Sequence, residues 1–246
     1  MSNTTETWVF LRGLMRESGH WGNLLQDFHA LHPNKNIISV DLPGTGTLFQ
    51  ETSPWTMEEY TEFVRRKVHP ASNIKVFAVS LGGMIASDWI HRYPDEVAGV
   101  VLVNTSFRGF SPFFRRLRPS AVWTLLRLFF TRDIRAREKL TLTMVSNLKK
   151  DREDILNRWV EIQQRHPVQP RNAIRQIWAA ARFRPPMDQP KAKILVLTAE
   201  HDNMVHSSCS KRIAEKWGLP IKTHPTAGHD LPLEDPVWIL DSIRNF

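Results

Sequence analysis

Short apolar runs, spaced along the chain, constrain its fold more than any other feature of the sequence. Each run is continuous and rich in valine, isoleucine or leucine, and does not alternate between apolar and polar residues. This pattern is typical of parallel strands whose two faces are both covered by helices. The five clearest runs are residues 8–11, 37–42, 74–79, 99–103 and 194–198, and 221–224 is a plausible final strand.

Segments with helical spacing of apolar residues lie between these runs. Thr56 and Glu59 form a capping-box pattern at the start of one helix, and Gly218 is suited to end another. Asp235 and Pro236 form an N-cap and first-turn pair for the last helix. Gly218 ends the predicted helix 208–217, the last helix spans 237–246, and two further helices are predicted over 21–30 and 83–92. The alternation of strand and helix predicts an α/β fold with a doubly wound, mostly parallel sheet.

The alternation breaks between residues 107 and 190. This segment contains no convincing strand but has long helical patterns, such as 121–130 and 154–164. We therefore expect an α/β core made of residues 1–106 and 191–246, with a helical insertion over 107–190. The insertion contains 18 of the 33 Lys and Arg residues but only 7 of the 25 Asp and Glu residues. Such asymmetry bears on binding partners and solubility rather than on the fold.

Several classes of protein are disfavoured by what the sequence lacks. No run approaches the ~18 apolar residues that a transmembrane helix needs, and the polar start carries no secretory pattern. Cys209 is the only cysteine, which excludes an intramolecular disulfide and disfavours a structural zinc site. There is no Walker-type loop and no glycine fingerprint for a dinucleotide. We expect a cytoplasmic protein that needs no metal or organic cofactor.

Ser80 is the candidate nucleophile, because it lies where a predicted strand passes directly into a helix. Residues 78–83 read AVSLGG. A serine on such a sharp turn projects its hydroxyl above the edge of the sheet, and the helix N-terminus favours developing negative charge. A buried serine that caps a helix is the alternative. The motif resembles the nucleophile elbow of the α/β-hydrolases, although Ala78 stands where that family usually has glycine.

The resemblance implies a carboxylate and then a histidine later in the chain. Asp202, in the loop after the strand 194–198, fits the acid best, with Glu200 as the alternative; a helix-capping aspartate would be the structural explanation of Asp202. His229 follows Gly228 after the predicted final strand and resembles the family's catalytic histidine. His201 is its main rival, because it adjoins Asp202.

The resemblance also implies an oxyanion hole made of the backbone N–H groups of Leu14 and Leu81. Arg12 occupies the position where family members usually carry histidine. A backbone donor survives a change of side chain, so Arg12 need not abolish catalysis. Residues 41–46 (DLPGTG) resemble the family's loop after its second conserved strand. The resemblance covers the chain from about residue 8 to residue 246, apart from the insertion.

The chain is thus identified as similar to carboxylesterases, among them the pimeloyl-carrier methyl ester esterases. This implies a Ser–His–Asp triad that cleaves esters or thioesters of small to medium acyl groups through an acyl-enzyme. Two alternatives stay open: a lipid-directed lipase or lysophospholipase, and a non-catalytic binding protein on the same fold.

In this family such an insertion forms a cap, or lid, that controls access of the substrate. We expect Trp123, Phe110 and Arg12 to contact the small acyl ester substrate. Three interpretations of the basic, aromatic insertion stay open: an apolar face packed on the core with solvated arginines, docking of an acidic acyl carrier protein, and contact with an anionic lipid surface. Nucleic acid is not an expected partner, because no nucleic-acid-binding module is recognisable.

Overall fold

The computed structural model describes residues 5–246, so the first four residues of the polar start lie outside it. Its centre is a sheet of six strands in the order β2-β1-β3-β4-β5-β6, and every neighbouring pair is parallel. The strands are β1 (Thr7–Leu11), β2 (Asn36–Val40), β3 (Ile74–Val79), β4 (Val97–Val103), β5 (Lys193–Ala199) and β6 (Ile221–His224). The prediction of a parallel α/β sheet is confirmed.

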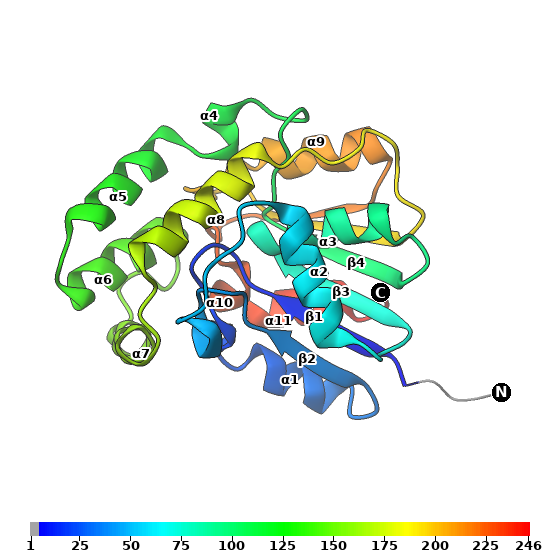
Figure 1. Cartoon of the computed structure of the whole chain (residues 1–246), viewed down its shortest axis with the longest axis horizontal. Coiled ribbons are helices and arrows are strands. Elements are labelled where there is room, and N and C mark those ends of the chain that lie inside the picture. The colour runs from blue at the N-terminus through cyan, green and yellow to red at the C-terminus, as the bar shows by residue number, and fades with distance from the viewer. Residues whose placement is uncertain (1–4) are drawn as a thin grey trace.

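Helices connect the strands and cover both faces of the sheet (Figure 1). The α-helices of the described residues are α1 (Leu24–Leu31), α2 (Met57–Val68), α3 (Leu81–Arg92), α4 (Phe113–Arg116), α5 (Pro119–Phe130), α6 (Ile134–Val145), α7 (Glu153–Arg165), α8 (Pro170–Arg182), α9 (Ser208–Trp217), α10 (Leu231–Glu234) and α11 (Pro236–Ile243). Two short 3-10 helices, η1 (Ser18–Trp21) and η2 (Gly46–Leu48), follow β1 and β2.

Successive strand residues face opposite sides of the sheet, which builds two hydrophobic cores. Val9 and Val76 face α2, α3 and α9. Phe10 and Phe77 face the other side, where α1 and α11 pack. Because both faces are buried, neither has to be polar, and this explains why the strands read as continuous apolar runs.

Local signals at helix ends are largely reproduced. Thr56 and Glu59 form the predicted capping box, and Gly218 ends α9 with a left-handed φ of 61°. Asp235 caps α11 through the N–H of Trp238, but that helix ends at Ile243, earlier than predicted. The second strand also ends earlier, at Val40, because the chain turns there into the loop 41–46.

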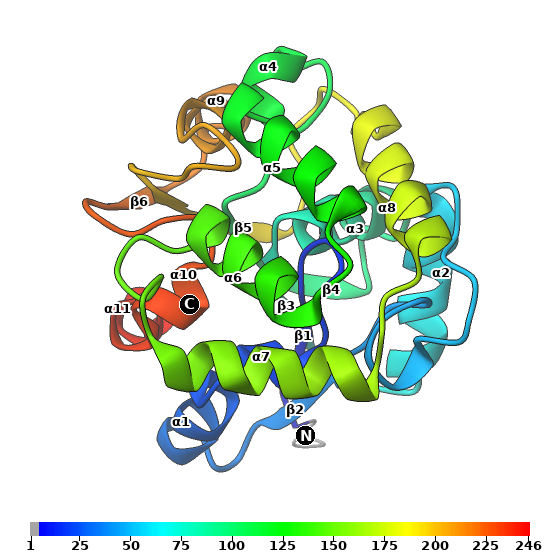
Figure 2. The same cartoon turned by 90° about the vertical axis from the view of Figure 1, so that its left-hand side faces the viewer.

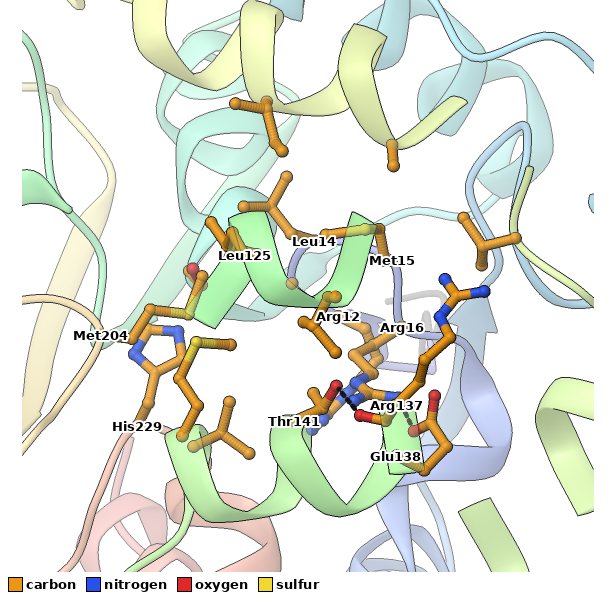
Figure 3. A pocket seen from close by; sticks show the side chains of 18 of the residues that line it. Arg12, Leu14, Met15, Arg16, Leu125, Arg137, Glu138, Thr141, Met204 and His229 are labelled. Carbon is orange, nitrogen blue, oxygen red and sulfur yellow. Dashed lines mark hydrogen bonds and ion pairs between the residues drawn. The ribbon is translucent and has the colours of Figure 1, made fainter. Parts of the chain in front are cut away.

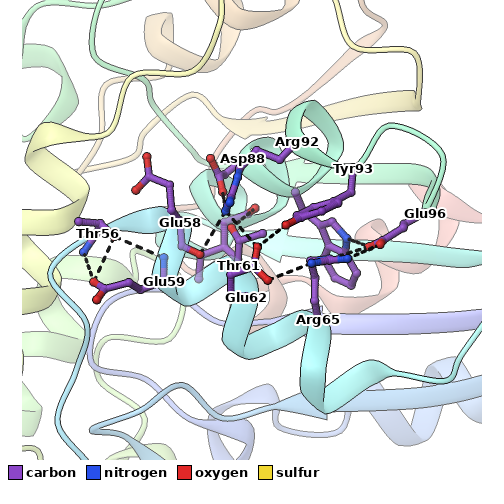
Figure 4. A network of polar contacts seen from close by, with 12 residues as sticks. Thr56, Glu58, Glu59, Thr61, Glu62, Arg65, Asp88, Arg92, Tyr93 and Glu96 are labelled. Carbon is purple, nitrogen blue, oxygen red and sulfur yellow. Dashed lines mark hydrogen bonds and ion pairs between the residues drawn. The ribbon is translucent and has the colours of Figure 1, made fainter.

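A polar network holds α2 against α3 on the outside of the sheet (Figure 4). Arg65 pairs with Glu96 and Glu62, and the Tyr93 hydroxyl donates to Glu62 at 2.6 Å. The indole N–H of Trp89 donates to Glu96 at 2.7 Å. These contacts fix the outer side of the helix that begins immediately after Ser80.

The helices α4–α8 follow one another between β4 and β5 and gather at one end of the molecule (Figures 1 and 2). β4 and β5 are nevertheless neighbours in the sheet. The segment therefore leaves the sheet at the carboxyl end of β4 and returns at the start of β5. The division into 1–106, 107–190 and 191–246, and the action of the insertion as a cap, stay predictions. Among the helices of residues 5–246, none is long and apolar enough to cross a membrane.

Candidate active site

Ser80 occupies a strained turn between β3 and α3. Its φ of 54° and ψ of −112° are rare for a residue with a side chain. Two hydrogen bonds keep the backbone in this conformation. The Ser80 N–H donates to the carbonyl of Val103 at 2.9 Å, and the Thr105 hydroxyl donates to the carbonyl of Ser80 at 2.7 Å. Such over-determined strain marks a position whose side chain has to point in one direction.

The turn is crowded, which explains its small residues. A β-carbon at Gly82 would lie 2.6 Å from the carbonyl oxygen of Leu11, so glycine is required there. Ala78, by contrast, is fully buried in β3, opposite Leu11 in register. Its methyl group is part of the core, and the departure from glycine at this position is accommodated.

Asp202 and His229 form a buried pair at the carboxyl ends of β5 and β6. The ring Nδ1 of His229 lies 2.7 Å from Oδ2 of Asp202, and both side chains are over nine-tenths buried. The other carboxylate oxygen accepts the N–H groups of Met204 and Val205 at 2.7 and 2.8 Å. Asp202 is thus held from two sides and orients the imidazole, which leaves Nε2 as the nitrogen free to exchange a proton.

The two rival residues lie elsewhere. Glu200 is an exposed residue whose carboxylate pairs with Lys211 at 2.6 Å. His201 is also exposed, and its backbone carbonyl accepts a hydrogen bond from the side-chain amide of Asn147. Adjacency in sequence to Asp202 therefore does not bring His201 into contact with the carboxylate, because neighbouring residues in this turn point in different directions.

The electrostatics of the pair favour a protonatable base. Burial by itself would lower the pKa of His229, but the negative charge of Asp202 and the hydrogen bond to it outweigh this effect. The pKa of His229 is consequently raised above its ordinary value of 6.5. Asp230 raises it further, whereas Arg12 opposes the rise.

Asn104 is a positioning residue that sequence reasoning missed. Its amide donates to the carbonyl of His229 at 2.8 Å, and its side-chain oxygen accepts the N–H of Ala199 at 2.9 Å. The residue has a left-handed φ of 46°. Asn104 therefore connects β5 to the loop that carries His229, which we call the histidine loop. The available signal was an asparagine directly after β4, a residue type that tolerates this conformation.

The loop that carries Leu14 lies against the nucleophile. A β-carbon on Gly13 would be 3.1 Å from Cβ of Ser80, so the two backbones approach closely. The Met15 N–H donates to Gln176 at 2.8 Å, which ties this loop to α8. No hydrogen bond found within residues 5–246 uses the N–H of Leu14 or Leu81. Both predicted oxyanion donors are therefore available next to Ser80.

Arg12 lines the same cavity, but its guanidinium has a partner within the protein. It contacts both oxygens of Asp230, at 3.1 and 2.6 Å, and lies 4.6 Å from the ring centre of Trp21. Both members of the pair are buried. The guanidinium therefore connects the loop that carries Leu14 to the loop that carries His229, since Asp230 follows His229, and the substrate contact of Arg12 stays a prediction.

We expect the substitution Arg12→Met to lower the free energy of unfolding by about 3–5 kcal/mol, because Asp230 would be left as an unpaired buried charge. Urea denaturation would measure the change. The double variant Arg12→Met, Asp230→Leu should recover part of the loss, since no buried charge then remains. If the single variant has unchanged stability but a raised KM, the structural role is contradicted and the predicted substrate contact of Arg12 is supported.

A cavity extends from Ser80 and His229 beneath the helical insertion (Figure 3). Near His229 its wall is apolar, with Leu14, Leu125 and Met204. At its far end lie Arg137 and the ion pair of Arg16 with Glu138, whose atoms are 2.9 Å apart. A second, smaller and mostly apolar cavity also borders Ser80, on the side of α3 and α4. Ser80 is therefore reached from two sides.

Two residues expected to contact the substrate, Trp123 and Phe110, line neither of the cavities beside Ser80. Trp123 points outward from α5 and is 66% exposed, while Leu125, Leu128 and Phe129 of that helix line the main cavity. Phe110 is buried against Phe107 and Trp217, with ring centres 5.7 and 5.3 Å away, and lines neither cavity. An aromatic residue in this segment can face the core, the cavity or solvent, and the local pattern does not distinguish these.

Comparison with known proteins agrees with the fold. The sequence model of the alpha/beta hydrolase family matches residues 8–242. No curated protein sequence matches the chain significantly. Solved structures with the same fold include a proposed lipase from Acinetobacter baumannii AYE, with 21% identity, a TM-score of 0.78 and coverage of 99% of this chain and 83% of that one.

Two further structures are equally similar in fold. An esterase from Rhodococcus sp. ECU1013 has 18% identity and a TM-score of 0.78, covering 98% of this chain and 90% of its own. A membrane phospholipase A, described as a bacterial virulence factor, has 18% identity and a TM-score of 0.78, covering 100% of this chain and 81% of its own. At these identities the likeness concerns the fold.

Proposed function

The chain belongs to the alpha/beta hydrolase family, and we propose that it is a serine esterase that uses Ser80, His229 and Asp202 as its triad. One observation carries this proposal: the strained Ser80 and the histidine of the buried His229–Asp202 pair border one cavity. Family membership supports hydrolysis of ester bonds as the reaction class. A helix-capping serine would explain neither the cavity nor the histidine.

The first half of the reaction forms an acyl-enzyme. Ser80 Oγ attacks the ester carbonyl carbon while His229 Nε2 takes the hydroxyl proton. The carbonyl oxygen becomes negatively charged and is stabilised by the N–H groups of Leu14 and Leu81. Neither N–H group donates a hydrogen bond to another acceptor within residues 5–246. The bond to the alcohol oxygen then breaks, and His229 returns the proton to that oxygen, so that a neutral alcohol leaves.

The second half repeats these steps with water. His229 takes a proton from a water molecule, whose oxygen attacks the acyl carbon and displaces Ser80 Oγ, which regains the proton. Throughout, Asp202 keeps Nδ1 protonated through its 2.7 Å contact. No step requires a group beyond these side chains, the two backbone donors and water.

The two cavities beside Ser80 suit the two halves of an ester. The residues that line both are Leu14, Ser80, Leu125, Ile177 and Met204, so the two cavities adjoin at the nucleophile. The acyl and alcohol groups of a substrate extend in opposite directions from the carbonyl carbon, so each can enter one cavity. Their mainly apolar walls favour small to medium acyl chains.

A series of p-nitrophenyl esters of increasing chain length, with a fluorophosphonate probe, tests this proposal. We expect hydrolysis with an optimum at short to medium chains, and covalent labelling of the folded protein. Folded protein that neither labels nor hydrolyses any member of the series would instead support a non-catalytic binding protein.

Hydrolysis of a carrier-bound methyl ester, and a cytoplasmic location, stay predictions. The basic insertion would attract an acidic carrier through long-range charge, so turnover of a carrier-bound ester should fall with added salt more than turnover of the free ester. An equal response to salt would count against carrier docking.

A further inference from the structure

The outer side of α4 and α5 exposes an unusual number of large apolar side chains. We call the following residues the α5 face: Phe113, Phe114, Trp123, Leu126, Phe129 and Phe130, which are between 49% and 80% exposed. In α5 itself only Ala121 is buried. The interpretation that this segment packs its apolar residues on the core and solvates its arginines does not describe α5. Trp123, Leu126 and Phe130 recur at helical spacing on one side of α5, and the ring centres of Phe129 and Phe130 lie 5.7 Å apart. Exposed apolar side chains gathered in this way mark an interaction site.

The same segment carries positive charge without any compensating acid. Residues 107–132 contain six arginines and no aspartate or glutamate. None of the ion pairs within residues 5–246 involves these arginines, which are Arg108, Arg115, Arg116, Arg118, Arg127 and Arg132. Those with recorded side-chain contacts donate to neutral acceptors, such as the Ser208 hydroxyl for Arg115. Arg116 is buried, but Arg127 in α5 and Arg132 directly after it are exposed, so the apolar residues of the α5 face are flanked by positive charge.

The combination of exposed apolar side chains with positive charge favours one class of binding partner over others. A second copy of the chain would bring the exposed arginines at α5, Arg127 and Arg132, against their own copies, and this repulsion disfavours self-association through this face. An acidic protein offers the charge complement, but it would also need an apolar surface to cover the exposed phenylalanines. An anionic phospholipid surface offers both complements, because phosphate groups receive the arginines while the aromatic rings enter the boundary between headgroups and acyl chains.

The α5 face also borders the mouth of the main cavity. Phe129 of α5 and Ile174 of α8 each line that cavity and are each about half exposed or more, so they stand at its opening. In Figure 2, α5 runs near the middle of the end that faces the viewer, and α8 lies to its right. A surface bound by α5 would therefore lie directly at the opening that leads to Ser80.

We propose that the α5 face docks the protein on anionic lipid bilayers. The aromatic residues enter the interface, the arginines bind the headgroup phosphates, and the cavity opens toward the lipid. Docking itself does not depend on catalysis. Only its consequence, that esters dissolved in the bilayer reach Ser80, rests on the proposed esterase function.

Vesicle sedimentation tests the docking without reference to activity. The full-length protein is mixed with phosphatidylcholine vesicles, with or without phosphatidylglycerol, and sedimented alone as a control for self-association. We expect binding to the anionic vesicles, weak binding to the neutral ones, and a loss of binding at high salt. The double variant Trp123→Ala, Phe130→Ala should bind the anionic vesicles at least about tenfold more weakly, because two interfacial aromatics are lost.

A matched variant controls for general loss of surface apolarity. Leu31 and Val237 are 55% and 67% exposed and lie on α1 and α11, so Leu31→Ala, Val237→Ala should bind like wild type. Both double variants should hydrolyse a soluble short-chain ester as wild type does, since none of the four residues lines a cavity. Absence of binding to anionic vesicles, equal binding to neutral ones, an equal loss in the control variant, or binding to an acidic carrier protein alone would overturn the proposal.

Discussion

Replacing Ser80 by alanine is expected to lower kcat for a soluble ester by about 10⁵- to 10⁶-fold, since the nucleophile and its base act as one unit. The side chain is small and lies at a turn held by backbone contacts, so the fold should persist. Kinetics on the p-nitrophenyl series measure the loss, and fluorophosphonate labelling should disappear with it.

Ser87 provides a matched control. It lies in α3, the helix that begins after Ser80, is fully buried, and its hydroxyl has no partner within residues 5–246. Ser87→Ala should therefore keep both hydrolysis and labelling. If Ser80→Ala keeps most of the wild-type rate, or if labelling persists, another residue is the nucleophile and the proposed function fails.

Asp202→Asn should lower kcat by about 10⁴-fold, because an amide next to Nδ1 favours the wrong tautomer of His229. Glu200→Gln is the control, since its exposed pair with Lys211 contributes little. Circular dichroism would check that both variants fold. A larger loss of kcat in Glu200→Gln than in Asp202→Asn would exchange the roles of the two acids.

The pH dependence follows from the same pair. His229 accepts the serine proton only when it is neutral, so kcat/KM should fall as the pH falls through its raised pKa. The midpoint of this acidic limb should therefore lie above the ordinary histidine value of 6.5. In Asp202→Asn the main cause of the raised pKa is absent, and the limb should move to lower pH. A midpoint that is identical in both proteins would show that Asp202 does not set the titration.

Much of the fold could be predicted because the relevant signals are local. A strand buried on both faces has to be apolar along its whole length, and helix ends require particular residues such as Thr56 and Gly218. Ser80, Asp202 and His229 were indicated by the resemblance to the α/β-hydrolases, whose motifs follow strand ends. Each follows a parallel strand, and the carboxyl ends of parallel strands meet at one edge of the sheet.

The contacts that complete the site are not local. Arg12 and Asp230 are 218 positions apart, and their pairing depends on how two loops meet above the sheet. Asn104 likewise donates a hydrogen bond to the backbone carbonyl of His229, 125 positions further along the chain. A residue's type indicates that it can form such bonds, but only the packing of the loops decides with which partner.

The insertion shows most clearly the difference between what local sequence signals determine and what depends on tertiary contacts. Its sequence by itself determined that it is helical, aromatic and strongly basic, since these are properties of composition and spacing. Only the tertiary structure decided that Phe110 is buried, that Leu125 faces the cavity and that Trp123 faces solvent. The reason is physical: periodicity shows which residues share a face of a helix, but the surroundings of that face depend on neighbours that are distant in sequence.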